Sequence, residues 1–73
     1  MLLTAIIRED GDWVTSFCPE LDVASQGKTV EEAKANLQEA VDLLLEVTPE
    51  EELVGRYRSA PFVTSFEVKD WAS

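Results

Sequence analysis

The sequence has 73 residues, close to the lower size limit for independent folding, so we expect a single domain over residues 1–73. Hydrophobic residues make up 45 % of the chain and charged residues 29 %, a mixture that argues against intrinsic disorder. Fifteen acidic and six basic residues give a net charge of −9. This charge repels a phosphate backbone, so we expect no direct nucleic acid binding and favour a basic protein as partner.

Small domains usually need a disulfide, a metal or a partner subunit, and the only thiol belongs to Cys18. We therefore expect a homodimer or a higher homo-oligomer. One cysteine suits a reducing compartment, and residues 1–7 lack the basic flank and cleavage site of a signal peptide. No run reaches the ~18 apolar residues of a membrane span, so we expect a cytoplasmic protein away from the membrane.

The N-terminal part of the chain predicts three short strands. Alternation predicts a first strand over residues 2–9, and Asp10-Gly11-Asp12 predicts a tight turn into an antiparallel strand over residues 13–17. Pro19 interrupts the pattern before a third strand over residues 23–26. Three apolar residues share one face of the first strand: Leu3, Ala5 and Ile7.

A capped helix from Thr29 to Val47 is the strongest structural signal in the sequence. Thr29 and Glu32 form a capping box, in which each side chain satisfies a backbone N–H at the helix start. Thr48-Pro49 ends the helix. Seven residues form an apolar arc of about 120° that suits a helix lying on a sheet: Val30, Ala33, Leu37, Ala40, Val41, Leu44 and Val47.

The C-terminal part predicts a loop followed by a last strand. Residues 50–53 can add a short turn, residues 55–61 read as loop, and residues 62–71 alternate as a strand, with Phe62, Phe66 and Val68 facing one way. The expected fold class is α+β in the order β-β-β-α-β, with one helix packed on a small mixed or antiparallel sheet. The second face of the sheet is left for another chain or for the 49–61 segment to cover.

The residue types argue against an enzyme. The chain contains no histidine, which removes the usual nucleophilic triads and ordinary zinc sites. Cys18 reads as a packing residue. Four carboxylates in the first two loops could hold Mg²⁺ for a metal-dependent nuclease: Asp10, Asp12, Glu20 and Asp22. Turns favour Asp in any case, however, and no basic cluster accompanies these residues. We therefore expect no metal and no cofactor, and keep a divalent-metal nuclease as an alternative.

Two sets of residues are candidates for protein binding. Acidic residues occupy an arc of about 100° on the outer face of the helix: Glu31, Glu32, Glu39, Asp42 and Glu46. Their mutual repulsion, increased by Glu50, Glu51 and Glu52 beyond the negative helix end, favours a cationic partner; a merely solvated face is the alternative. The second set consists of large apolar or aromatic residues that can be either oligomer interface anchors or ordinary packing residues: Trp13, Leu43, Tyr57 and Trp71.

The order of these motifs resembles the HicB-like antitoxin family. That family shows a Gly-x-Thr-x-Glu-Glu-Ala-x-x-Asn-x-x-Glu-Ala helix after a Pro-containing loop, and the resemblance covers about residues 1–47. The usual acidic residue after the glycine is Lys28 here. The matching residues are Gly27, Thr29, Glu32, Ala33, Asn36, Glu39 and Ala40.

The resemblance implies a partial ribonuclease H-like fold, with the last strand beside the first. It also implies an antitoxin that neutralises a small basic ribonuclease toxin of the HicA type by covering its active site. Many members continue into a DNA-binding segment, whereas this sequence ends soon after Trp71, so we expect operator binding to be lacking or supplied by another protein. An orphan homo-oligomer without a toxin partner is the alternative.

Overall fold

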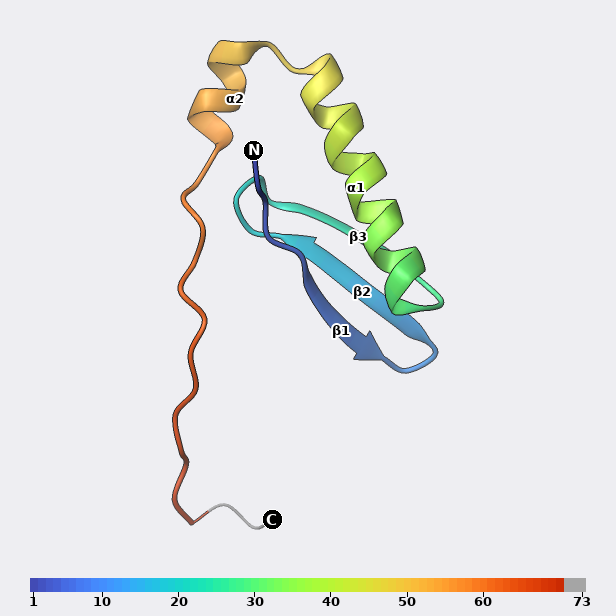
Figure 1. The fold of residues 1–73 in the computed structure, drawn as a ribbon, viewed down its shortest axis with the longest axis vertical. Coiled ribbons are helices and arrows are strands. Elements are labelled where there is room, and N and C mark those ends of the chain that lie inside the picture. Colours follow the sequence, from blue (N-terminus) through green and yellow to red (C-terminus); the bar gives the residue numbers. More distant parts are fainter. Residues whose placement is uncertain (71–73) are drawn as a thin grey trace.

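The structure is a computed structural model, which describes residues 1–70 (Figure 1). The antiparallel sheet has the order β1-β2-β3, and the long helix α1 packs mainly on β3 and β2. This confirms the expected α+β class and the order β-β-β-α. The elements are β1 (Ile6–Asp10), β2 (Trp13–Cys18), β3 (Val23–Gly27), α1 (Val30–Val47) and α2 (Glu50–Arg56).

A two-residue turn joins β1 to β2, as the sequence predicts. Asp10 pairs with Trp13, so Gly11 and Asp12 form the turn, and Gly11 takes the left-handed φ of 64° that a glycine adopts without strain. β1 begins at Ile6, later than expected. The reason lies at Thr4, whose backbone N–H donates to the Glu20 carboxylate and not to a neighbouring strand.

The core lies between β2 and α1. Val14, Ser16 and Cys18 alternate along β2 with residues on the opposite face, and all three are buried. The Ser16 hydroxyl donates to the backbone oxygen of Ala33 at 2.8 Å, which satisfies the one polar group of this row. The apolar residues that meet them are Leu21, Ala33, Leu37 and Val41.

The second face of the sheet is open within residues 1–70, as expected. Ile6 and Phe17 lie opposite each other in the β1–β2 ladder, and Trp13 shares their face. Their side chains are 43 %, 37 % and 42 % exposed. The 49–61 segment does not cover them.

The segment after α1 forms a second short helix, α2, where only a turn was expected. Glu50, Glu51 and Glu52 occupy its first turn. They still follow the negative C-terminal end of α1, as expected, but they also lie at the positive end of the α2 dipole, which offsets the unfavourable position. Neither helix formed by residues 1–70 is long and apolar enough to cross a membrane.

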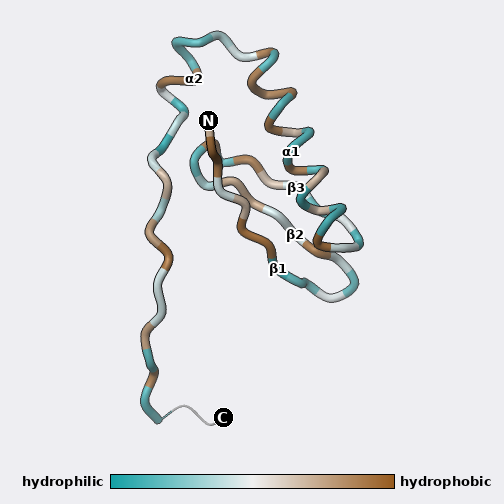
Figure 2. The backbone as a smooth tube through the Cα atoms, in the orientation of Figure 1, coloured by the Kyte–Doolittle hydropathy of each residue, from teal (hydrophilic) through white to brown (hydrophobic). Residues whose placement is uncertain are grey.

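The expected last strand over residues 62–71 was wrong for the part that the structure describes. Residues 57–68 form no ladder, and the chain runs from α2 away from the sheet (Figure 1). A strand is stabilised by hydrogen bonds to a neighbouring strand, and this segment has no neighbour along its described length. Its brown positions in Figure 2 mark an apolar sequence, yet Phe62 and Phe66 are 102 % and 86 % exposed. Trp71 lies outside the described residues.

Candidate protein-binding surfaces

The family-like motif forms the junction between β3 and α1. A Cβ at Gly27 would lie 2.7 Å from the Ala33 backbone nitrogen, so only glycine permits this close approach. Ala33 is fully buried at the same contact. The Asn36 side-chain amide donates to the Gln26 backbone oxygen at 2.8 Å and ties α1 to β3. These motif residues therefore hold the helix in place on the sheet.

The predicted Thr29 cap is confirmed, and the Glu32 carboxylate also bonds back to the backbone at the helix start, but to Lys28 and not to the N-cap residue itself. The Thr29 hydroxyl accepts the Glu32 backbone N–H at 3.0 Å, and Glu32 Oε1 accepts the Lys28 backbone N–H at 2.8 Å. Of the five candidate acidic residues, Glu32 thus has a structural role at the helix start.

The other four acidic candidates lie on the solvent face of α1. Glu31, Glu39, Asp42 and Glu46 are exposed, and the buried residues of α1 occupy the opposite side. Two apolar side chains lie at the margin of this face, on the flank of α1 that turns towards Val23 and Arg56: Leu43 is 59 % exposed and Val47 is 67 % exposed. The prediction that Val47 belongs to the sheet-facing apolar arc was therefore wrong, because the helix extends past the sheet at this end. We call the four acidic residues together with Leu43 and Val47 the acidic face. A rigid helix here combines carboxylates with apolar surface, the composition of a protein interface with a polar rim.

The candidate interface anchors do not form one patch. Trp13 lies on the open face of the sheet, where the Lys28 ammonium stands 4.1 Å from its ring centroid. Leu43 lies on α1, on the other side of the two layers. Tyr57 follows α2 and is 44 % exposed. Trp71 lies outside the described residues, so its predicted role is not placed.

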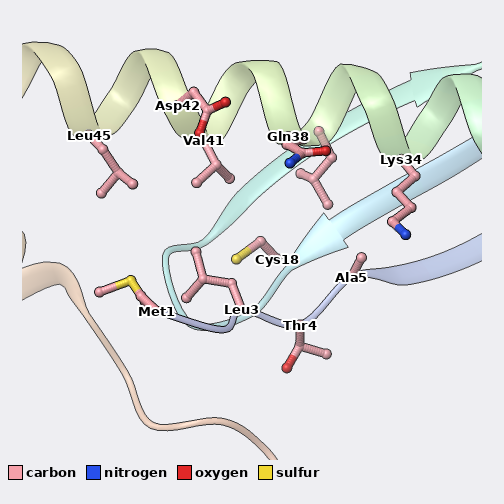
Figure 3. A pocket seen from close by; sticks show the side chains of 11 residues that line it. Met1, Leu3, Thr4, Ala5, Cys18, Lys34, Gln38, Val41, Asp42 and Leu45 are labelled. Carbon is pink, nitrogen blue, oxygen red and sulfur yellow. The ribbon is translucent and has the colours of Figure 1, made fainter.

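A groove that the sequence reasoning missed lies between α1 and the segment leading into β1 (Figure 3). Its volume is about 280 Å³. Val41 and Leu45 point from the helix towards Met1 and Leu3, and Lys34 reaches towards Ala5, as Figure 3 shows. The apolar alternation of Leu3 and Ala5 in the sequence is a signal for its floor, but the groove itself depends on how the N-terminal segment meets α1.

The β2–β3 loop contains a buried carboxylate. Glu20 is 1 % exposed and accepts the backbone N–H of Thr4 at 3.0 Å and its hydroxyl at 2.6 Å. The Thr4 hydrogen bonds hold the pKa of Glu20 below its ordinary value of 4.5, although burial opposes them. Burial raises the pKa of the neighbouring Cys18 thiol, which fits its expected role as a packing residue.

The loop carboxylates considered for Mg²⁺ lie in two separate places. Asp10 and Asp12 belong to the β1–β2 turn, whereas Glu20 and Asp22 belong to the loop at the other end of β2. The six residues of β2 separate these ends by roughly 20 Å at about 3.3 Å per residue. No group of three or more possible metal ligands occurs within the part of the chain that the structure describes.

Arg56 and Arg58 hold the end of α2 against the β2–β3 loop. The Arg56 Nε donates to the Leu21 backbone oxygen at 2.8 Å, and the Arg58 backbone N–H donates to the Glu20 backbone oxygen at the same distance. These contacts determine where the C-terminal segment leaves the domain. Comparison of the chain with protein-family models, curated proteins and solved structures gives no match.

Proposed function

We propose that this chain is an antitoxin-like module that binds a small basic ribonuclease toxin of the HicA type and neutralises it by covering it. The observation that carries the proposal is the acidic face, in which four exposed carboxylates adjoin exposed Leu43 and Val47 on one rigid helix. Apolar side chains supply affinity at such a surface, and the carboxylates orient a cationic partner and speed its approach.

The position of α1 supports the proposal. Gly27, Ser16 and Asn36 fasten the helix to the sheet through a close backbone approach and two hydrogen bonds. A surface held in this way loses little conformational entropy when a partner binds. The motif resemblance to HicB-like antitoxins rests on the same junction, so the features that suggest the family are those that present the acidic face.

Binding, and not catalysis, is the proposed activity in the cytoplasm. The chain lacks histidine, its loop carboxylates lie at opposite ends of β2, and its one thiol is buried. These features support a metal-free and cofactor-free module in a reducing compartment. No direct contact with operator DNA is proposed for this chain, because the net charge of −9 opposes contact with phosphates.

The test is a binding measurement between the chain and the product of the adjoining reading frame, where that frame encodes a basic protein of about 60–90 residues, a size typical of small domains. A triple variant, Glu39→Gln, Asp42→Asn and Glu46→Gln, removes three charges from the acidic face. We expect binding to weaken roughly 10- to 100-fold, at about 0.5–1 kcal/mol for each rim charge.

The matched control is Glu50→Gln, Glu51→Gln and Glu52→Gln, which changes the net charge equally but on α2. It should alter binding by less than about threefold, since long-range fields are screened at physiological salt. Equal weakening by both triple variants would show a general charge effect and no specific face. Failure to bind the neighbouring product or any basic protein from the cell extract would overturn the proposal.

A further inference from the structure

The free edge of β1 and the groove beside it could together accommodate a further strand. Within residues 1–70, β1 pairs only with β2, so its other edge presents backbone N–H and C=O groups that no described strand pairs with. Alongside the chain that enters this edge lies the groove beneath α1. Polar side chains contribute at its margin, namely Thr4, Lys34, Gln38 and Asp42, but most of its lining is apolar. The apolar lining residues are Met1, Leu3, Ala5, Cys18, Leu37, Val41 and Leu45. A strand laid on this edge would extend the sheet, and its inward side chains would enter the groove.

The C-terminal segment has the residue pattern of a strand but is not paired with the sheet. Within residues 62–68 the apolar Phe62, Phe66 and Val68 alternate with Val63, Ser65 and Glu67, so one side of an extended chain is apolar and the other mostly polar. All three of the first group are at least 66 % exposed. Such a segment is not stable alone in water and requires both backbone partners and an apolar surface.

The course of the segment directs it away from its own sheet. The Arg58 backbone N–H donates to the Glu20 backbone oxygen, which fixes the departure point beside the β2–β3 loop. From there the chain runs apart from β1 along its described length (Figure 1). Its own β1 edge and groove are therefore left free to receive the same segment of another copy.

We propose that residues 62–68 of one copy form a fourth strand on the free β1 edge of a second copy, with Phe62, Phe66 and Val68 filling the groove beneath α1. Each copy carries one donor and one acceptor, so the exchange closes as a two-fold symmetric dimer. At about 150–250 Å² for each aromatic side chain, the four donated phenylalanines bury roughly 600–1,000 Å². Burial of Val68, the segment backbone and the receiving groove adds to this area, which brings the total to the roughly 1,000 Å² that a biological interface should exceed. The inference goes beyond the proposed function, because it needs no toxin and uses a surface that shares only Asp42 with the acidic face.

The experiment measures the dimer dissociation constant by sedimentation of the complete chain and of two pairs of variants. Phe66→Asp places a charge on the apolar side of the segment, and Ser65→Asp places it on the polar side one residue away. Leu45→Asp places a charge in the groove, whereas Leu43→Asp places it on the opposite flank of α1. We expect Phe66→Asp and Leu45→Asp each to weaken the dimer by about a hundredfold or more, because each acts twice per dimer. The two control variants should change it by less than about fivefold.

Mixing the two disrupted variants tests the exchange itself. The Leu45→Asp chain retains an unaltered C-terminal segment, and the Phe66→Asp chain retains an unaltered groove. The mixture should therefore form a heterodimer with a lower dissociation constant than the homodimer of either variant. Phe66 is exposed in the single chain, so Phe66→Asp should leave the helical circular dichroism unchanged and keep the result interpretable.

Hydrogen exchange distinguishes the other outcomes. Amides of residues 63–68 should become protected only at concentrations at which the dimer forms. Protection that is independent of concentration in a monomer would show that the segment pairs with its own β1, and this would overturn the proposal. A dimer that survives Phe66→Asp would show another interface and would overturn it equally. Neither outcome bears on toxin binding, so the two proposals fail separately.

Discussion

Residues 13–47 and residues 57–70 contrast in what their apolar patterns achieve. Both segments place apolar side chains at regular spacing, but the first buries Val14, Leu37 and Val41, and in the second Phe62 and Phe66 are exposed. The helix satisfies its backbone within the segment, and β2 has a strand on each side. The C-terminal segment has neither source of hydrogen bonds. An amphipathic pattern thus specifies a face, and burial follows only where a partner is available.

The largest difference in stability should be between alanine substitutions of two leucines in the same helix. Leu37 is 4 % exposed in the core, whereas Leu43 is 59 % exposed. Leu37→Ala should lower the free energy of unfolding by about 2–5 kcal/mol through lost burial and a residual cavity. Leu43→Ala should lower it by less than about 0.5 kcal/mol, typical of a surface position.

Urea denaturation followed by circular dichroism checks this pair, at a concentration that keeps the chain monomeric. Equal destabilisation by both substitutions would contradict the assignment of α1 faces on which the acidic face depends.

A second difference should separate two glycines. A Cβ at Gly27 would meet the Ala33 backbone nitrogen at 2.7 Å and the Glu32 carbonyl carbon at 2.9 Å, and neither atom belongs to a flexible side chain. Gly27→Ala should therefore lower the free energy of unfolding by about 1–3 kcal/mol. Gly55 lies in α2 with open space around it, so Gly55→Ala should raise that free energy by up to about 1 kcal/mol.

Thermal unfolding of the two alanine variants and the parent protein measures the opposite signs directly. A Gly27→Ala variant as stable as the parent protein would show that β3 and α1 can move apart at this junction without a loss of unfolding free energy.

The smallest effect at neutral pH concerns the Glu20 carboxylate, which ties the entry of β1 to the β2–β3 loop. Its pKa in the folded state lies below the ordinary 4.5, so ionised Glu20 stabilises the fold above that pH. This stability is lost as the pH falls through the lowered folded pKa. Glu20→Gln should therefore flatten the acid limb of the stability curve.

Urea denaturation at a series of pH values from about 2 to 7 measures this slope, across the range in which a carboxyl titrates. Thr4→Val provides the control, because it removes the 2.6 Å hydroxyl bond and keeps the backbone donor. It should reduce the acid dependence in the parent and leave it unchanged in the Glu20→Gln background. A further change in that background would assign the dependence to another group.

The sequence by itself determined the parts of this protein whose causes are local. The two-residue turn at Gly11 and Asp12, the Thr29–Glu32 cap and the apolar stripe of α1 each depend on residues a few positions apart. The same local periodicity placed four carboxylates on the solvent face of the helix. Short-range geometry and periodicity suffice for these features.

Only the tertiary structure decided the features that depend on distant residues. Thr4 delays the start of β1 because it meets Glu20, sixteen positions away. Arg56 reaches back to Leu21, and this contact directs the C-terminal segment away from the sheet. The groove beneath α1 likewise depends on how the N-terminal segment and the helix meet. Local periodicity carries no information about such long-range contacts. A strand in particular must pair with a neighbouring strand, and its own residues do not specify which one.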